Sequence, residues 1–210
     1  MSSEPTSHSP ATTPSGTAAP KTSRLFFAWQ PDELTRSRLL DWQKRLGRSR
    51  QLSAGIRWLN PDQLHVSLLF LGEVPEEQAG TVIERAAAAA DDLVARGVQP
   101  AIELDQLAFF PRRSRPRVLV LAGPASGGLK DWHRALRQAV LDLVPAIERP
   151  LPLKPHVTLG RVTSHQATGA KLARVREPVL WPATPLSLME SQLQPSGAVY
   201  LTRWSHQATA

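Results

Sequence analysis

The chain has 210 residues, of which 41% are hydrophobic, and it carries a formal net charge of +7. This length suits one domain of ordinary size, or two small lobes that share a core. The sequence contains no cysteine, which excludes disulfides, zinc–thiolate sites and cysteine nucleophiles. A basic excess favours an anionic partner such as nucleic acid, although an Arg-rich solvated surface explains it equally well.

Residues 1–23 are rich in Ser, Thr, Pro and Ala, which predicts a disordered tail that includes His8. They lack the basic start and apolar middle of a signal peptide. No apolar run in the chain reaches the roughly 18 residues that a membrane span needs. We therefore expect a cytoplasmic protein with one folded domain over residues 24–205 and a C-terminal tail over residues 206–210.

The first half of the domain predicts two helices, each of which begins with proline and acidic residues and ends at a glycine. The first helix follows Pro31 and ends at Gly47, and the second opens at Pro75 and ends at Gly97. The second helix has its buried face at Val82, Ala86, Ala90 and Leu93. Short apolar or alternating runs predict strands at residues 25–29, 56–59, 65–71 and 101–110. The third of these strands ends at Gly72.

The second half begins with a basic loop over residues 111–117, which has no periodicity. A helix over residues 128–144 follows, with an apolar stripe at Leu129, Trp132, Leu136, Ala139 and Leu143. Residues 164–185 look irregular, with one helical turn. The remaining strands are expected at residues 118–121, 155–162, 186–193 and 199–204. This interleaving indicates an α/β or α+β class, and the roughly repeated order of elements suggests two related lobes.

Two of the expected strands carry the same short motif, a histidine followed two positions later by a hydroxyl residue. The first copy is His65-Val66-Ser67-Leu68 and the second is His156-Val157-Thr158-Leu159. Because side chains alternate along a strand, the histidine and the hydroxyl residue share one face and lie roughly 6.6 Å apart. That spacing lets an imidazole and a hydroxyl reach different oxygens of one phosphate.

Two histidines that face each other across a phosphate can act as an acid/base pair. The ordinary pKa of imidazole is about 6.5, so one ring can be neutral and the other protonated near neutral pH. Each proton transfer contributes roughly 10²–10⁴ in rate, and Ser67 and Thr158 would donate hydrogen bonds to the non-bridging oxygens. Either motif alone is more often a hydrogen-bonded core pair, but two copies favour a site, since burying polar pairs is costly.

Other kinds of site find less support in the sequence. Each motif strand offers one metal ligand, with no Asp, Glu or third His at ligand spacing, so no metal and no cofactor are expected. A Gly-x-Ser-x-Gly elbow, a Walker A loop and a dinucleotide glycine fingerprint are all missing. His133, His165 and His206 are interpreted as surface residues and not as catalysts.

The paired motifs resemble the signature of the 2H phosphoesterases, and more closely their RNA 2′,3′-cyclic phosphodiesterase branch, also called 2′-5′ RNA ligases. The resemblance covers about residues 24–205, and it includes the order and spacing of further segments at residues 24–28, 57–58, 72–74, 110–111 and 115–119. It implies an α+β, bilobal fold with pseudo-twofold lobes. In that fold two antiparallel sheets face each other across a central cleft, with the helices outside and one motif in each lobe.

The same resemblance implies a metal-independent enzyme that opens a 2′,3′-cyclic phosphate at an RNA 3′ end to a 2′-phosphate, with 2′-5′ ligation as the reverse reaction. It implies that His156 is the base that activates water and that His65 is the acid that protonates the 3′ oxygen. The family also places an arginine, here Arg161, on the phosphate beside the two hydroxyl residues. Strict alternation points Arg161 away from His156, so either the strand twists or ends near Gly160, or Arg161 does not touch the phosphate itself and acts through other residues.

Several assignments stay open at the level of sequence. Phe27 could stack on a base or belong to the core. The loop arginines Arg112, Arg113 and Arg115 could contact RNA phosphates or form an ordinary solvated loop. The alternatives are a 2H enzyme that acts on a small cyclic nucleotide or ADP-ribose derivative, and a non-catalytic RNA-binding protein. The expected partner is an RNA or oligonucleotide with a 2′,3′-cyclic phosphate end, or a small cyclic nucleotide. The expected state is a monomer without membrane contact.

Overall fold

The computed structural model describes residues 21–144, 147–148, 152–172, 174–182, 185–195 and 197–206. The strands are β1 (Thr22–Trp29), β2 (Ile56–Trp58), β3 (Val66–Pro75), β4 (Ala101–Phe110), β5 (Val118–Ala122), β6 (His156–Val162), β7 (Arg174–Pro182), β8 (Leu186–Gln194) and β9 (Gly197–His206). The helices are α1 (Glu33–Gly47), α2 (Arg50–Gly55), α3 (Glu76–Ala95) and α4 (Gly127–Val140), with short 3-10 helices η1 (Pro61–Gln63) and η3 (His165–Gly169).

The boundaries of the folded part differ slightly from those expected. The expected N-terminal tail lies outside the described residues up to residue 20, and β1 begins at Thr22, two residues before the predicted domain start. At the other end β9 continues to His206, and the rest of the expected C-terminal tail, residues 207–210, lies outside the described residues. Within the described ranges, no helix is both long and apolar enough to cross a membrane.

In the described part of the chain, nine strands form one antiparallel sheet in the order β7-β4-β5-β6-β3-β1-β8-β9, with β2 paired to β6. At its centre, β3 and β6 share a single residue pair, Val66 with Val157. Every other neighbouring pair in this order is joined by at least five residue pairs. The two sheets predicted by the family resemblance are therefore two halves of one sheet, one with β3, β1, β8 and β9 and the other with β7, β4, β5, β6 and β2, and the two motif strands form the junction.

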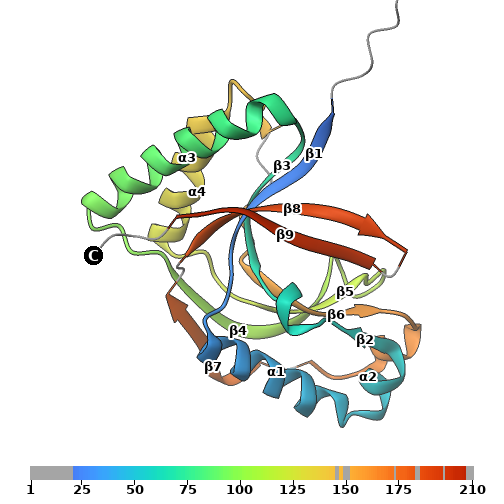
Figure 1. Cartoon of the computed structure of the whole chain (residues 1–210). Coiled ribbons are helices and arrows are strands. Elements are labelled where there is room, and N and C mark those ends of the chain that lie inside the picture. Colours follow the sequence, from blue (N-terminus) through green and yellow to red (C-terminus); the bar gives the residue numbers. More distant parts are fainter. Residues whose placement is uncertain are drawn as a thin grey trace, which may run out of the picture.

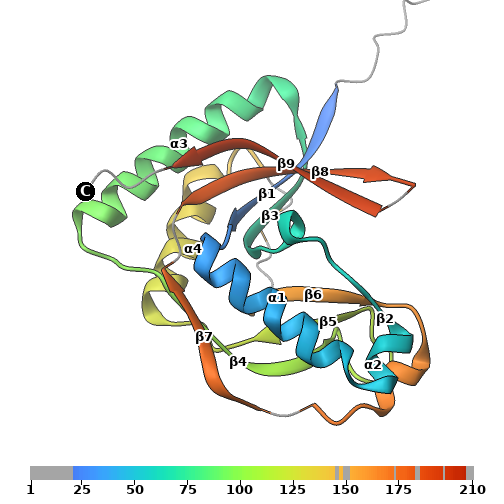
Figure 2. The same cartoon turned by 60° about the horizontal axis from the view of Figure 1, so that its bottom comes forward.

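The helices lie on the outside of the two halves. Figures 1 and 2 show α3 and α4 together beside the half that contains β1, β3 and β8, and α1 and α2 against the half that contains β5 and β6. A large core joins strands of both halves, and in it the rings of Trp29 and Trp132 pack edge to face with centroids 5.9 Å apart. The α+β architecture with helices outside, as predicted, is confirmed.

Local chemistry explains where the helices begin and which faces they bury. The side chain of Asp32 caps α1 by accepting a hydrogen bond from the Thr35 N–H at 2.7 Å, so this acid precedes the first turn. The predicted buried face of α3 is confirmed. α4 ends at Val140, four residues before the predicted end, and Val140 takes the buried position that had been assigned to Ala139.

Three local predictions were wrong. Residues 174–182, expected to be irregular, form β7, and Pro178 is tolerated there because β7 lies at the edge of the sheet and has a partner on only one side. The short helix α2 was not predicted. β3 does not end at Gly72 but runs to Pro75, because Gly72 takes φ +79° in a bulge opposite the Leu25–Phe26 step of β1.

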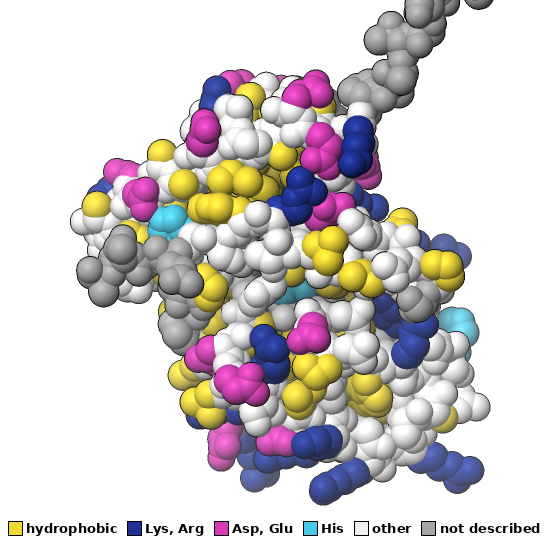
Figure 3. Space-filling view, viewed as in Figure 1, with side chains coloured by type: hydrophobic (Ala, Val, Ile, Leu, Met, Phe, Trp, Pro, Cys, Tyr) yellow, Lys and Arg dark blue, Asp and Glu magenta, His cyan; other side chains and the backbone are white. Residues whose placement is uncertain are grey.

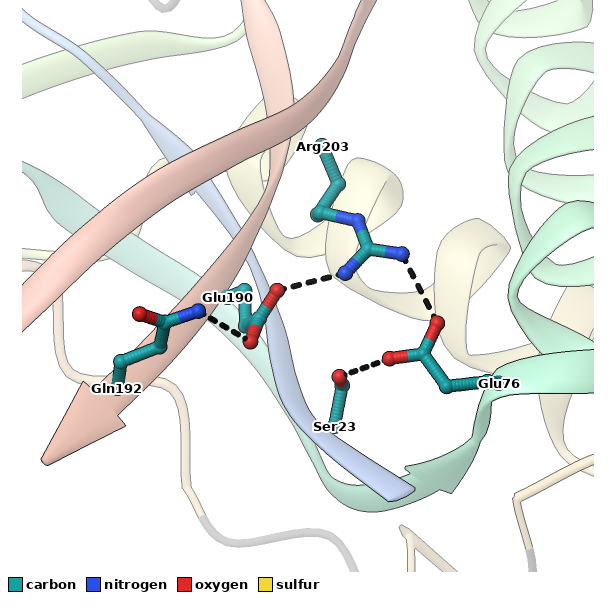
Figure 4. A network of polar contacts seen from close by, with 5 residues as sticks. All are labelled: Ser23, Glu76, Glu190, Gln192 and Arg203. Atoms are coloured by element: carbon teal, nitrogen blue, oxygen red, sulfur yellow. Dashed lines mark hydrogen bonds and ion pairs between the residues drawn. The ribbon is translucent and has the colours of Figure 1, made fainter. Parts of the chain in front are cut away.

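The long β8–β9 hairpin is tied to the rest of the molecule by a polar network, shown in Figure 4. Arg203 on β9 pairs with Glu190 on β8 at 2.6 Å and with Glu76 at the start of α3 at 3.0 Å. Ser23 on β1 donates to Glu76, and Gln192 donates to Glu190 at 2.9 Å. These contacts link the hairpin to the start of α3 and to β1.

Candidate active site

A pocket of about 330 Å³ lies where the two halves of the sheet meet. Both motifs contribute to its wall, with side chains at His65, Ser67, His156, Thr158 and Arg161. The central pair joins Val66 to Val157. When the antiparallel register is continued by one residue on each side, His65 lies opposite Thr158 and Ser67 lies opposite His156. The structure thus brings all five predicted site residues together, and we call this space the phosphate pocket.

Both histidines are held in the same way by the backbone. Nδ1 of His65 lies 2.8 Å from the carbonyl oxygen of Gln63, and Nδ1 of His156 lies 2.7 Å from that of Lys154. Because a carbonyl oxygen can only accept, each Nδ1 carries the hydrogen and donates it. This leaves Nε2 of each ring to accept a proton when the ring is neutral, or to give one when it is protonated.

Burial makes both rings weak bases in the free protein. Burial is the main cause that lowers the pKa of His65 to about 4, and the charge of His156 makes a smaller contribution in the same direction. Burial also lowers the pKa of His156, and in both cases the hydrogen bond to the backbone carbonyl opposes the shift. An anion between the rings favours the protonated form, because opposite charges attract strongly in such a site. A phosphate group therefore supplies the charge that lets one ring hold a proton.

A bulge in β6 explains how Arg161 reaches the pocket. The β5–β6 register passes from Leu119 opposite Gly160 to Val120 opposite Thr158, so Leu159 is the extra residue. The extra residue reverses the alternation, and Arg161 is exposed on the pocket side. The alternation of β6 is thus broken next to Gly160, which is one of the two alternatives that the sequence left open.

Two further contacts support this bulge. The carbonyl oxygen of Leu159 accepts hydrogen bonds from the Leu59 N–H at 3.0 Å and from Nε2 of Gln43 at 2.8 Å. Gln43 is a buried residue of α1 that also donates to the Leu59 carbonyl oxygen at 2.9 Å. At Gly160 an added Cβ would lie 2.4 Å from Cγ2 of Ile56, so β2 can approach β6 only because this residue is glycine.

Aromatic rings enclose the histidines, and the sequence analysis did not identify them. Tyr200, the only tyrosine of the chain, packs edge to face on His65 with centroids 4.8 Å apart, and Phe26 lies 5.2 Å from the same ring. Phe110 packs on His156 at 4.8 Å. Alternation along β1 shows that one of two adjacent phenylalanines must face the pocket, but it does not tell which one.

The residues proposed for RNA contacts lie elsewhere. Phe27 is fully buried, so of the two roles that the sequence left open the core role is confirmed and base stacking is excluded. The loop arginines Arg112, Arg113 and Arg115 are exposed, and none of them lines the phosphate pocket. Arg113 donates to the carbonyl oxygens of Thr168 at 2.7 Å and Ala170 at 2.9 Å, so it braces η3. Figure 3 shows Lys and Arg side chains along the edge of the lower half and a histidine in the hollow between the halves.

The other histidines fall into two groups. His165 is exposed, as predicted. His133 is partly buried on α4, and burial together with Arg137 lowers its pKa, while His206 is largely covered and its Nε2 lies 2.8 Å from Oδ1 of Asp91. The prediction that these two are bland surface residues was wrong. Across the residues that the structure describes, no group of three or more His, Cys, Asp or Glu side chains is arranged to hold a metal ion.

Comparison with known proteins agrees with the geometry of the site. The family model of the 2′-5′ RNA ligase superfamily matches residues 39–195. A Thermus thermophilus protein named RNA 2′,3′-cyclic phosphodiesterase is 33% identical over 183 residues, which cover 84% of this chain and 86% of that protein. An Archaeoglobus fulgidus protein of the same name is 28% identical, with 84% and 96% covered.

Solved structures show the same architecture. The crystal structure of TT0787 of Thermus thermophilus superposes with a TM-score of 0.70 at 29% identity, over 88% of this chain and 97% of that chain. The apo form of E. coli LigT shares the fold with a TM-score of 0.66 at 24% identity, over 89% and 97%. The family resemblance predicted from the paired motifs is confirmed, and the chain belongs to the 2′-5′ RNA ligase superfamily.

Proposed function

We propose that the protein hydrolyses the 2′,3′-cyclic phosphate at RNA 3′ ends to a 2′-phosphate, without a metal ion. The observation that carries this proposal is the convergence of two His-x-Ser/Thr motifs and Arg161 on one pocket. Relatives that match most of the chain are named RNA 2′,3′-cyclic phosphodiesterase, which supports the same substrate.

The two hydroxyl residues and the arginine would hold the phosphate. Ser67 and Thr158 both line the pocket and would donate hydrogen bonds to the non-bridging oxygens of the phosphate. Arg161 adds a permanent positive charge that balances the charge of the five-coordinate transition state. Such prearranged donors stabilise the transition state more than the ground state, and this makes them catalytic.

The histidines carry the protons. Nε2 of His156 takes a proton from water, the water oxygen forms a bond to phosphorus, and the bond from phosphorus to the 3′ oxygen breaks. Nε2 of His65 gives a proton to that oxygen, which leaves a 3′-hydroxyl and a 2′-phosphate. Two aromatic rings enclose His65, so its imidazolium holds a proton less firmly and is the better acid.

A cyclic-phosphate-ended oligonucleotide in EDTA tests this mechanism. We expect hydrolysis to a 2′-phosphate in the wild-type protein and near-complete loss in His65→Ala and in His156→Ala. His165→Ala is the matched control, because His165 is exposed and lies outside the phosphate pocket. Inhibition by EDTA, or activity that survives both substitutions at the pocket, would overturn the proposal.

A small cyclic nucleotide is the second candidate substrate. It is favoured by the loop arginines, which lie outside the phosphate pocket and so do not extend it along an RNA backbone. RNA that contacts many phosphates binds more weakly as salt rises, because counterions are released on binding. RNA is supported as the substrate if KM for the oligonucleotide rises steeply with salt while KM for 2′,3′-cyclic AMP stays constant. Equal salt dependence supports the small substrate.

We also propose that the protein acts as a monomer, because a single chain supplies both histidines, both hydroxyl residues and the arginine that the proposed mechanism uses. Light scattering after size exclusion should then give a mass near 23.0 kDa at the concentrations used for activity assays. A stable mass of twice this value would contradict it.

A further inference from the structure

Arg57 on β2 lies directly beside Arg161, at the rim of the phosphate pocket. The two residues are register partners in the antiparallel pair of β2 and β6, so their side chains leave the sheet on the same face. Leu59, two residues after Arg57, lines the phosphate pocket, which agrees with this face. Arg57 itself is exposed and is not part of the pocket lining. Its side chain therefore lies just outside the space that the cyclic phosphate would fill.

The hairpin of β8 and β9 reaches the same rim from the other half of the sheet. Leu193 and Ala198 are register partners near its turn, and both line the phosphate pocket. At Gly197 an added Cβ would lie 3.9 Å from Nη2 of Arg57, so the guanidinium lies next to the first residue of β9. Gln63 holds this end of the hairpin by donating to the Ala198 carbonyl oxygen at 2.8 Å. The guanidinium of Arg57 thus lies where the two halves meet at the rim.

Two arginines opposite each other are unfavourable without an anion, because like charges at such positions destabilise a sheet. Among the residues that the structure describes, neither Arg57 nor Arg161 forms an ion pair with a carboxylate. Arg24, which also lines the phosphate pocket, differs from them because it lies opposite Glu73 in the register of β1 and β3. Phosphate is a suitable anion, since a guanidinium can donate two parallel hydrogen bonds to its oxygens. On the proposed function Arg161 binds the cyclic phosphate, which leaves Arg57 for a second one.

We propose that Arg57 binds the phosphate that joins the last two nucleotides of an RNA substrate. An RNA that ends in a 2′,3′-cyclic phosphate continues only from the 5′ oxygen of its last nucleoside, so this diester is the phosphate nearest to the reacting one. 2′,3′-cyclic AMP has no second phosphate for Arg57 to bind. Arg57 therefore favours an RNA end over a cyclic mononucleotide, without taking part in the chemical step.

Two substrates that differ by one nucleotide test this assignment, which rests on the proposed function. They are 2′,3′-cyclic AMP and the dinucleotide ApA with a 2′,3′-cyclic phosphate at its 3′ end. In Arg57→Met we expect kcat/KM for the dinucleotide to fall about tenfold or more, mainly through KM, because a charged hydrogen bond is lost. For 2′,3′-cyclic AMP, kcat/KM should stay within about twofold. Arg176→Met, at an exposed arginine of β7 outside the phosphate pocket, is the matched control and should change neither value.

A third substrate separates the charge of the joining phosphate from the added nucleoside. It is the same dinucleotide with a neutral methylphosphonate in place of that phosphate. In the wild-type protein it should lose the same factor as Arg57→Met does, and in Arg57→Met the replacement should cost nothing further, because both changes remove one interaction. The wild-type measurement needs no variant, so it still decides the question should Arg57→Met fail to fold, as judged by circular dichroism.

The possible outcomes separate the two proposals. Equal loss on the dinucleotide and on 2′,3′-cyclic AMP would place Arg57 on the reacting phosphate and overturn the assignment. No loss on either substrate would overturn it as well, and so would a methylphosphonate that the wild-type protein cleaves as well as the dinucleotide. In each of these cases the wild-type protein still opens cyclic phosphates. A wild-type protein that opens none would overturn the proposed function, and the assignment with it.

Discussion

His65 and His156 are both neutral in the free protein at neutral pH, because burial lowers the pKa of each ring. The proposed mechanism needs His65 protonated and His156 neutral when the substrate arrives. The anionic phosphate raises both pKa values once it is bound. Substrate binding and proton uptake are therefore coupled at this site, and the coupling is visible in the pH dependence of the rate.

We expect kcat/KM to be highest below pH 6.5 and to fall as pH rises through neutrality. This parameter reports the free protein, in which the acid His65 has a pKa of about 4 and the pKa of His156 is also below its ordinary value. Above both pKa values, a rise of one pH unit lowers the fraction of protonated His65 about tenfold. Steady-state rates on 2′,3′-cyclic AMP from pH 4.5 to 8.5 check this, and the kcat profile should lie at higher pH. A kcat/KM that rises from pH 6.5 to 8 would contradict the assignment.

We expect Gln43 to act on the reaction through Arg161, although it lies outside the pocket. Gln43→Met keeps the length of the side chain but removes both hydrogen bonds, so the bulge at Leu159 loses its support from α1. We expect kcat to fall toward the value of Arg161→Met, which loses about 10²–10³ as one charged donor to the transition state disappears. Both variants should be measured side by side. If Gln43→Met lowers stability but leaves kcat unchanged, the role of Gln43 is purely structural.

At the scale of elements, the β8–β9 hairpin matters because it brings Tyr200 to His65. Ser191 and Leu193 of β8 line the phosphate pocket, and they alternate with Glu190 and Gln192, which belong to the polar network of Figure 4. One face of the hairpin therefore forms the wall of the site, while the network holds the other face.

We expect Arg203→Met to destabilise the protein only modestly at neutral pH, because both ion pairs of Arg203 are partly exposed to solvent. The substitution leaves the carboxylates of Glu76 and Glu190 without their shared cation. Hydrogen bonds hold both pKa values below the ordinary value of 4.5, first those from Ser23 to Glu76 and from Gln192 to Glu190, and after them those from Arg203. The stabilisation is thus present above pH 4.5 and is lost as pH falls below it. Urea unfolding at pH 7 and at pH 3.5 checks this, and an equal difference at both pH values would contradict it.

The sequence predicted most elements because their signals are local. Proline, acidic residues and glycine mark the helix ends, and the apolar spacing of α3 gives its buried face. β7 escaped prediction because its proline and charges are acceptable only at a sheet edge, and edge position depends on the whole sheet. The position of Arg161 depends on a bulge, which follows from packing against Ile56 and Gln43 and not from alternation.

At the scale of the whole molecule, the two halves of the sheet are not the two halves of the chain. The half with the first motif contains β1 and β3, but also the C-terminal β8 and β9. The half with the second motif contains β2 from the N-terminal part. The sequence placed one motif on each side of the cleft, but periodicity shows which residues form strands and not which strands pair. Pairing between distant segments is decided by the completed fold.

A chain that ends at residue 182 should therefore fail to fold, although it retains both motifs. It lacks β8 and β9, which would leave the buried Phe26 and one edge of β1 exposed. We expect loss of the cooperative thermal transition and binding of the dye ANS, because apolar surface becomes accessible. A chain that ends at residue 206, and so lacks only residues 207–210, is the matched control and should keep the cooperative transition. A cooperative, active protein ending at residue 182 would contradict the shared-core architecture.

The single pair of Val66 with Val157 relates the two motifs by an approximate twofold rotation, with each histidine opposite the other motif's hydroxyl. Such a frame by itself cannot tell the 2′ oxygen from the 3′ oxygen, since a half turn exchanges the roles of the two rings. The equivalent positions five residues beyond each histidine break this symmetry, with Phe70 on one side and Arg161 on the other. We expect this unlike pair to contribute to the regiochemistry of ring opening, together with the unequal aromatic packing on the two histidines. Exchanging Phe70 and Arg161 should then shift part of the cleavage toward the 2′ oxygen and give some 3′-phosphate, which analysis of the products of 2′,3′-cyclic AMP checks.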